Sequence, residues 1–127
     1  MINAIIGDAK TASALAGGQG SRLGFDGPKG CYDVGLPSRK SLFRLQGERL
    51  RKLEVLSGAA KPVPWYVMTS PATDEATRAY FAAQGYFGLR EDQCFFFTQG
   101  VLPAFDGDGK ILLEARSRVS VAPDGNG

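Results

Sequence analysis

A chain of 127 residues fits one domain, since a typical domain runs to about 100–150 residues. The hydrophobic share of 43% includes no apolar run long enough to span a membrane, and the net charge of +2 is too small to indicate a nucleic-acid-binding protein. The chain contains no histidine, which excludes Ser-His-Asp and Cys-His catalysis, histidine-ligated metal sites and a histidine pH switch.

The cysteines, glycines and charges narrow the class further. Cys31 and Cys94 are far apart and form no CxxC pair, so a zinc site made of cysteines alone is excluded. The sparse cysteines, together with the lack of a signal-peptide pattern in the first ten residues, favour a cytoplasmic protein. Residues 1–64 hold ten Lys and Arg against five Asp and Glu, so this half could attract an anion. Seventeen glycines, where about nine would be usual, indicate loops in which the backbone turns sharply or meets a ligand.

The first expected element is a short strand over 12–16, although Ala and Ser are poor strand formers. A helix is expected next, because Ser38 or Ser41 can cap its start and Gly58 can end it. Ser38, Arg39 and Lys40 are expected to form a solvated loop, and the alternative is a structural role or a place near phosphate. The apolar stripe of the helix consists of five leucines at helical spacing: Leu42, Leu45, Leu50, Leu53 and Leu56.

Two apolar strands and a second helix follow. Residues 63–68 (VPWYVM) predict a buried strand with Pro64 near its start, and residues 94–98 (CFFFT) predict another. Between them the pattern predicts a helix over 73–84, capped by Thr73 and ended by Gly85. The aromatic residues of both strands and the two cysteines are expected in the core: Cys31, Trp65, Tyr66, Cys94 and Phe95–Phe97.

The last elements are a turn and a strand. Residues 106–109 (DGDG) are a strong turn signal, and residues 111–114 predict a strand after it. No repeat or long linker divides the chain. The order strand, helix, strand, helix, strand therefore predicts an α/β fold with a parallel sheet and right-handed crossovers.

The glycine-rich segment LAGGQGSRLG at 15–24 is the first candidate binding site. Three glycines within four residues let the backbone approach an anion and point several N–H groups at it. Arg22 adds a planar charged donor and Lys29 adds a point charge, and both suit phosphate. The spacing matches neither the ATPase phosphate loop nor GxGxxG. Spacing alone leaves two interpretations open, a phosphate or nucleotide site and a glycine-rich surface turn.

Two further polar segments follow predicted strands. Gln99 comes directly after the CFFFT strand, and residues 123–127 (PDGNG) close the chain. Ligands of open α/β sheets bind outside the carboxyl ends of the strands, and the Gln99 amide could both donate to and accept from a base edge. The alternatives are a solvated strand end for Gln99 and a plain turn for 124–127.

Several longer segments carry a resemblance. LAGGQGSRLG at 15–24 is followed by PKG at 28–30, GLPSRKS at 35–41, WYVMTS at 65–70, QGVLPA at 99–104 and APDGNG at 122–127. In this order they resemble the eukaryotic UDP-N-acetylglucosamine pyrophosphorylases, a UTP-dependent branch of the sugar-nucleotide uridylyltransferases. The resemblance covers Leu15 to the last residue, and the later segments are far more specific to this branch than the glycine loop alone.

The resemblance implies an α/β, Rossmann-like nucleotidyltransferase domain with a mostly parallel three-layer sheet, present here in truncated form. It implies that UTP and N-acetylglucosamine 1-phosphate are joined to UDP-N-acetylglucosamine with release of pyrophosphate, and that Mg²⁺ is used. Arg22 and Lys29 would be catalytic, and Asn126 would contact the sugar substrate. Nucleotide contacts are implied for Leu15, Ala16, Gly17, Gly18, Lys29, Gln99 and Gly125.

The ends of the chain depart from the family pattern. Residues 1–14 match it poorly, so the partial catalytic domain is expected over 15–127. The family's metal-binding aspartate and most of its sugar pocket would lie beyond the chain, so no metal ligand is assigned here and the chain alone is expected to be an inactive fragment. The alternatives are a non-catalytic module that binds nucleotide or a protein partner, and a UDP-sugar pyrophosphorylase of broader sugar specificity.

Overall fold

The centre of the molecule is a parallel sheet of three strands. The computed structural model describes residues 12–15, 24–58 and 61–123. The sheet has the order β1–β2–β3, formed by β1 (Ala12–Leu15), β2 (Trp65–Thr69) and β3 (Cys94–Thr98). Met68 of β2 lies opposite both Leu15 and Phe97, so all three strands end at the same edge. The predicted parallel α/β fold is confirmed.

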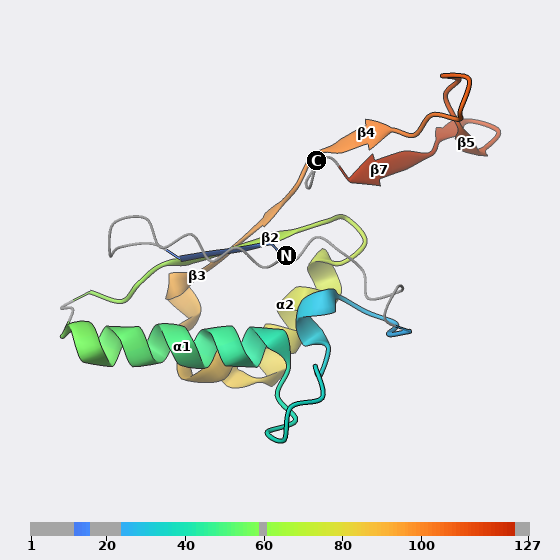
Figure 1. Ribbon diagram of the computed structural model, residues 1–127. Coiled ribbons are helices and arrows are strands. Elements are labelled where there is room, and N and C mark those ends of the chain that lie inside the picture. Colours follow the sequence, from blue (N-terminus) through green and yellow to red (C-terminus); the bar gives the residue numbers. More distant parts are fainter. Residues whose placement is uncertain (1–11, 16–23, 59–60, 124–127) are drawn as a thin grey trace.

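Two helices, α1 (Leu42–Ser57) and α2 (Asp74–Ala83), cover one face of this sheet, as Figure 1 shows. Ser41 caps α1 with its Oγ, which accepts the Arg44 N–H at 3.2 Å, and Gly58 ends the helix with a φ of 57°. Thr73 precedes α2 as predicted, but its side chain makes no cap bond. None of the helices in the described ranges is long and apolar enough to cross a membrane.

The core between helices and sheet is largely aromatic. Phe81 of α2 is fully buried, and its ring centroid lies 4.9 Å from those of Phe43, Phe87 and Phe96. Trp65 lies 5.1 Å from the same ring, so one phenylalanine joins both helices to β2 and β3. The buried apolar residues of the described ranges are Phe43, Leu50, Trp65, Val67, Phe81, Phe87 and Leu89.

The predicted leucine stripe of α1 is wrong in its second half. Leu50 is buried, but Leu53 and Leu56 are exposed. The buried face instead runs through Phe43, Gly47 and Leu50. Gly47 decides this rotation, because a Cβ there would lie 2.7 Å from the Cβ of Phe87.

The second face of the sheet is not covered by any described element. Tyr66, Phe95 and Phe97 point to this face and are exposed, whereas they were expected in the core. Tyr66 and Phe95 stack with centroids 5.1 Å apart. We call these three residues the open face. The described residues therefore form two layers, the sheet and the helices on one of its faces. An apolar strand is buried on both faces only when both faces of its sheet are covered.

The segment after α2 has an unusual backbone. The 3₁₀ turn η3 (Gly85–Gly88) has positive φ at all four residues: 55° and 82° at its glycines, 50° at Tyr86 and 58° at Phe87. Phe87 is buried against both helices, so this left-handed turn delivers a core residue. A second short turn, η4 (Glu91–Gln93), leads into β3.

Beyond β3 the chain forms a protruding antiparallel arm over residues 101–123 (Figure 1). Its strands are β4 (Val101–Pro103), β5 (Leu113–Ala115), β6 (Arg118–Val119) and β7 (Val121–Pro123), paired as β4–β7 and β5–β6. The predicted turn at 106–109 is confirmed, since the Asp106 carboxylate accepts the N–H groups of Asp108 and Lys110 at 2.9 Å. The strand predicted from residue 111 begins two residues later.

Candidate functional site

The carboxyl edge of the sheet is where the predicted site residues gather. β1 ends at Leu15, β2 ends at Thr69 and β3 ends at Thr98, side by side. Ligands of open parallel sheets bind outside this edge, where loops leave the strands. Leu15 is the last residue of β1 and Gln99 comes directly after β3. Both residues therefore lie on the edge where the sequence predicted a ligand.

Gln99 is buried at this edge rather than solvated. Its backbone N–H donates to the Thr69 carbonyl at 2.8 Å, which extends the pairing of β3 with β2 by one residue. The residue is only 8% exposed, and its Oε1 has no partner among the described residues. The alternative of a solvated strand end is wrong. An unpaired buried amide oxygen costs about 1–3 kcal/mol, so this atom is suited to accept from a bound ligand.

A group of hydroxyl side chains beside Gln99 was missed by the sequence analysis. Thr69 Oγ1 donates to Asp74 Oδ1 at 2.6 Å, and the Ser70 N–H donates to Thr73 Oγ1 at 3.1 Å. Hydrogen bonds from Arg78 and Thr69 hold the pKa of Asp74 below its ordinary value. The only sequence signal was their position, since Thr69 and Ser70 end an apolar strand.

The arm returns the chain to the same edge. β4 and β7 pair antiparallel with Val101 opposite Pro123, so the end of the arm lies beside its beginning, two residues after Gln99. Gly125 and Asn126 follow within three residues but lie outside the described residues. The pairing still explains how segments 24 residues apart in sequence (99 and 123) reach one place.

The segment that carries Lys29 is fixed by packing, while Lys29 itself is exposed. Lys29 opens the 3₁₀ turn η2 (Lys29–Cys31), whose next residue, Gly30, is buried against Phe43. Figure 1 shows η2 beside the first part of α2. The packed turn therefore fixes the position of the Lys29 backbone, while the Lys29 side chain is exposed and can approach an anion.

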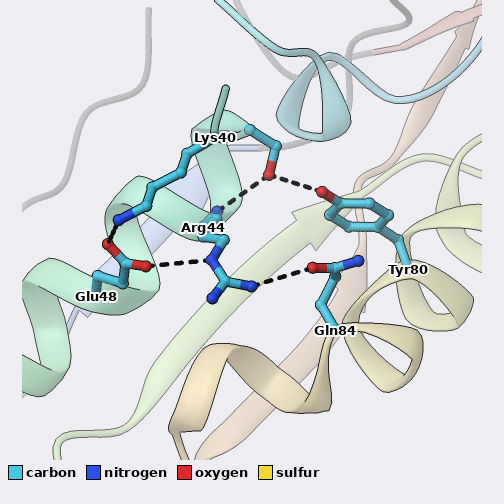
Figure 2. Close-up of polar contacts among 6 residues, drawn as sticks. Lys40, Arg44, Glu48, Tyr80 and Gln84 are labelled. Carbon is cyan, nitrogen blue, oxygen red and sulfur yellow. Dashed lines mark hydrogen bonds and ion pairs between the residues drawn. The ribbon is translucent and has the colours of Figure 1, made fainter. Parts of the chain in front are cut away.

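Polar contacts link the first turns of α1 to α2 (Figure 2). The Tyr80 hydroxyl donates to Ser41 Oγ at 2.8 Å, and Arg44 Nη1 donates to Gln84 Oε1 at 3.3 Å. Lys40 and Arg44 both donate to the Glu48 carboxylate, at 2.6 and 3.2 Å. These bonds hold the pKa of Glu48 below its ordinary value, with the Lys40 hydrogen bond as the largest cause. Lys40, expected in a solvated loop, thus belongs to an ordered cluster.

The cysteines are structural. Cys31 and Cys94 are free, half-buried and packed against the core, as predicted. Burial raises the pKa of each thiol to about 11, so neither is a nucleophile at neutral pH. Within the described ranges no three Cys, Asp or Glu side chains could hold a metal ion together.

The remaining predicted site residues lie outside the described residues. These are Ala16, Gly17, Gly18, Arg22, Gly125 and Asn126. Ala16 follows Leu15 at the end of β1, and the arm's base leads toward Gly125, so the described edge adjoins both segments. Leu15 and Gln99 lie on the same edge of the sheet, at the ends of two strands that β2 separates, and Lys29 lies on η2, which packs against α1 and α2.

Gly30→Ala is expected to destabilise the chain by about 1–3 kcal/mol, because the new methyl group would overlap the Phe43 ring. The matched control is Gly107→Ala, since no heavy atom lies within 4 Å of a Cβ there. Urea unfolding followed by tryptophan fluorescence measures both. Equal midpoints for the two variants would show that η2 is not seated on Phe43.

Comparisons with known proteins agree with this geometry. The family described as UTP–glucose-1-phosphate uridylyltransferase matches residues 11–127. UDP-N-acetylglucosamine pyrophosphorylase of Saccharomyces cerevisiae is 53% identical over an alignment of 125 residues; the match covers 96% of this chain and 26% of the yeast protein. UDP-N-acetylglucosamine diphosphorylase 1 of Arabidopsis thaliana is 52% identical over an alignment of 121 residues; that match covers 89% of this chain and 24% of the Arabidopsis protein.

A solved structure is similar over the same part. The uridine diphosphate N-acetylglucosamine pyrophosphorylase from Trypanosoma brucei, in complex with an inhibitor, superposes with a TM-score of 0.75 at 41% identity. The match covers 87% of this chain and 23% of the trypanosomal one. The chain thus spans about a quarter of the length of the curated relatives it matches.

Proposed function

The chain belongs to the UTP–glucose-1-phosphate uridylyltransferase family, and from that membership we propose that it supplies the uridine-nucleotide-binding part of an enzyme that makes UDP-N-acetylglucosamine. The substrates would be UTP and N-acetylglucosamine 1-phosphate. The identity of 53% to the yeast pyrophosphorylase favours this sugar over broader UDP-sugar specificity. Turnover would need the polypeptide that the relatives hold outside the matched part.

The observation that carries the nucleotide site is the buried amide oxygen of Gln99, which has no partner among the described residues. Uracil presents an N3–H donor between two carbonyl acceptors, and an amide side chain offers the complementary acceptor and donor. A ligand that donates a hydrogen bond to this buried acceptor would remove the free-energy cost of leaving it unpaired. We therefore assign the uracil ring to the carboxyl edge at Gln99, with Leu15, Ala16, Gly17, Gly18 and Gly125 as further nucleotide contacts.

The proposed chemistry needs positioning and charge rather than a nucleophilic side chain. A phosphate oxygen of the sugar phosphate attacks the α-phosphorus of UTP, and pyrophosphate leaves from the opposite side. Arg22 and Lys29 would stabilise the charge that grows on the leaving group, and Asn126 would hold the sugar. The exposed Lys29 on its seated turn fits this role, and the high thiol pKa values fit the absence of covalent catalysis.

The proposal also covers where Mg²⁺ would bind, what would cover the open face, and the compartment of the protein. The described residues contain no cluster that fits a metal, so no step is assigned to Mg²⁺, whose ligands we place elsewhere in the longer enzyme. A Rossmann-like third layer would cover the open face, since parallel sheets are normally covered on both faces. Free thiols fit the cytoplasm, where disulfides are rare.

Gln99→Leu is expected to weaken UTP binding by about 1–3 kcal/mol, because leucine fills the same space without an acceptor. Calorimetric titration with UTP measures the loss in a full-length chimera, in which this chain replaces the matched 125 residues of the yeast relative. Gln46→Leu on α1 is the matched control and should bind UTP as the parent does. Unchanged affinity of the Gln99 variant would remove Gln99 from the site.

A further inference from the structure

The arm over residues 101–123 carries apolar side chains without burying any of them. None of its described side chains is buried, and eight large apolar ones are exposed by 40% or more. A monomer rarely leaves so many neighbouring apolar side chains in water unless they bind a partner. These residues are Val101, Leu102, Phe105, Ile111, Leu112, Leu113, Val119 and Val121.

The arm has no core of its own that could hold it together. Its paired strands are two or three residues long, and isolated two-stranded ribbons are marginally stable in water. In the β4–β7 ribbon, Pro103 lies opposite Val121 and Leu102 opposite Ala122, so both faces of the ribbon are apolar. Figure 1 shows the arm reaching away from α1 and α2. Its order therefore depends on a surface that the described residues do not supply.

Charge identifies the kind of surface. The arm holds three acidic residues, Asp106, Asp108 and Glu114, and three basic ones, Lys110, Arg116 and Arg118. It has no net charge, so a nucleic acid or an anionic membrane has no electrostatic preference for it. An apolar protein surface fits it better.

We propose that the arm is the docking surface for the part of a full-length uridylyltransferase that lies outside the match to this chain. The relatives hold about three quarters of their length there, since the chain covers 24% and 26% of two of them. That is the polypeptide available to the arm in every relative, and within one chain it is present at high effective concentration. A second copy of this chain would instead have to find the arm by collision.

Docking on the arm also borders the candidate site. The arm begins two residues after Gln99 and returns with Pro123 beside Val101, so a surface covering the arm lies next to the carboxyl edge. The inference rests on family membership and on the exposed arm. It does not depend on the nucleotide site, so the two can fail separately.

The test uses the whole 127-residue chain, tagged, co-expressed with the remaining part of the yeast relative. We expect the two polypeptides to co-purify and to elute as a one-to-one complex. The double variant Phe105→Lys/Leu113→Lys should weaken association by about tenfold or more, because lysine would be buried in an apolar interface. The matched control is Val55→Lys/Leu56→Lys, which replaces two exposed apolar residues of α1 and should associate as the parent chain does.

Three results would overturn the proposal. The parent chain does not associate with a remaining part that is folded by circular dichroism; the arm variant associates as tightly as the parent; or light scattering shows that the chain alone is a dimer that the arm variant breaks. Binding of UTP is not part of this readout. A complex that forms but does not bind UTP would contradict the proposed function without contradicting the docking surface.

A second measurement does not need the remaining part to fold alone. Leu113→Cys and Val55→Cys are placed separately in the isolated chain and in the full-length chimera, and maleimide labelling is mapped by peptide mass spectrometry. Labelling of Cys at 113 should slow by about tenfold or more in the chimera, while labelling at 55 stays unchanged. Equal rates at 113 in both proteins would contradict the docking surface.

Discussion

Phe81→Ala is expected to remove about 3–5 kcal/mol from the free energy of unfolding. The side chain extends from α2, is fully buried and lies against rings of α1, β2 and β3. Its removal leaves a cavity that rigid aromatic neighbours cannot fill. A domain of this size is stable by only about 5–15 kcal/mol, so the variant would lose a large share of its stability.

Urea unfolding of the purified chain, followed by far-ultraviolet circular dichroism, measures this loss. Phe105→Ala in the arm is the matched control, since Phe105 is 57% exposed and its removal should change stability by about 0.5 kcal/mol or less. If both variants unfold at the same urea concentration, the aromatic cluster around Phe81 does not hold helices and sheet together.

Arg22→Ala is expected to lower kcat of the full-length chimera by about 10²–10³, by analogy with other charge-stabilising donors. The residue lies outside the described residues, so its role comes from the family pattern. Arginine is suited to the task because its fork binds two phosphate oxygens at once and stays charged at any working pH. If it stabilises the leaving pyrophosphate, kcat falls more than the affinity for UTP.

The rate is followed by release of pyrophosphate at saturating substrates, with Arg49→Ala as the control. Arg49 is an exposed arginine of α1 and should be dispensable. Arg22→Lys should recover part of the loss, since it keeps the charge without the fork. Turnover of Arg22→Ala close to that of Arg49→Ala would remove Arg22 from the mechanism.

Local signals in the sequence predicted the element boundaries well. The cap at Ser41, the glycine end at Gly58 and the Asp106 turn each depend on a few adjacent residues, and all three are confirmed. The parallel order of the strands also followed from the sequence, because connections through helices leave few other topologies.

Burial was harder to predict, because it depends on what packs from elsewhere. The leucine stripe of α1 was right at Leu50 and wrong at Leu53 and Leu56, and the left-handed turn instead brings Phe87 against Gly47. Tyr66, Phe95 and Phe97 are large aromatic residues of the kind usually found in a core, but no described layer covers them. A strand's own residues do not state how many layers the fold has.

In the candidate site, too, the local position of a residue was predicted from the sequence but its burial was not. Gln99 was predicted from its place after an apolar strand, yet its burial follows from its bond to the Thr69 carbonyl on the neighbouring strand. Thr69 and Ser70 were missed, and Thr73 was predicted only as a helix cap, because hydroxyl residues at a strand end are as common in plain turns as in sites. Local bonds at the junction of β2 and α2 bring the three hydroxyl groups together.

The left-handed turn at Gly85–Gly88 bears on the order in which the chain folds. Its positive φ costs about 1–2 kcal/mol at each of Tyr86 and Phe87, and burial of the Phe87 ring returns about 1.5–3 kcal/mol. This gain is available only after α1, α2 and the sheet have met around Phe81, so we expect the turn to close late rather than to nucleate folding. When it closes, Phe87 packs against Gly47 and fixes how α1 is rotated against the turn.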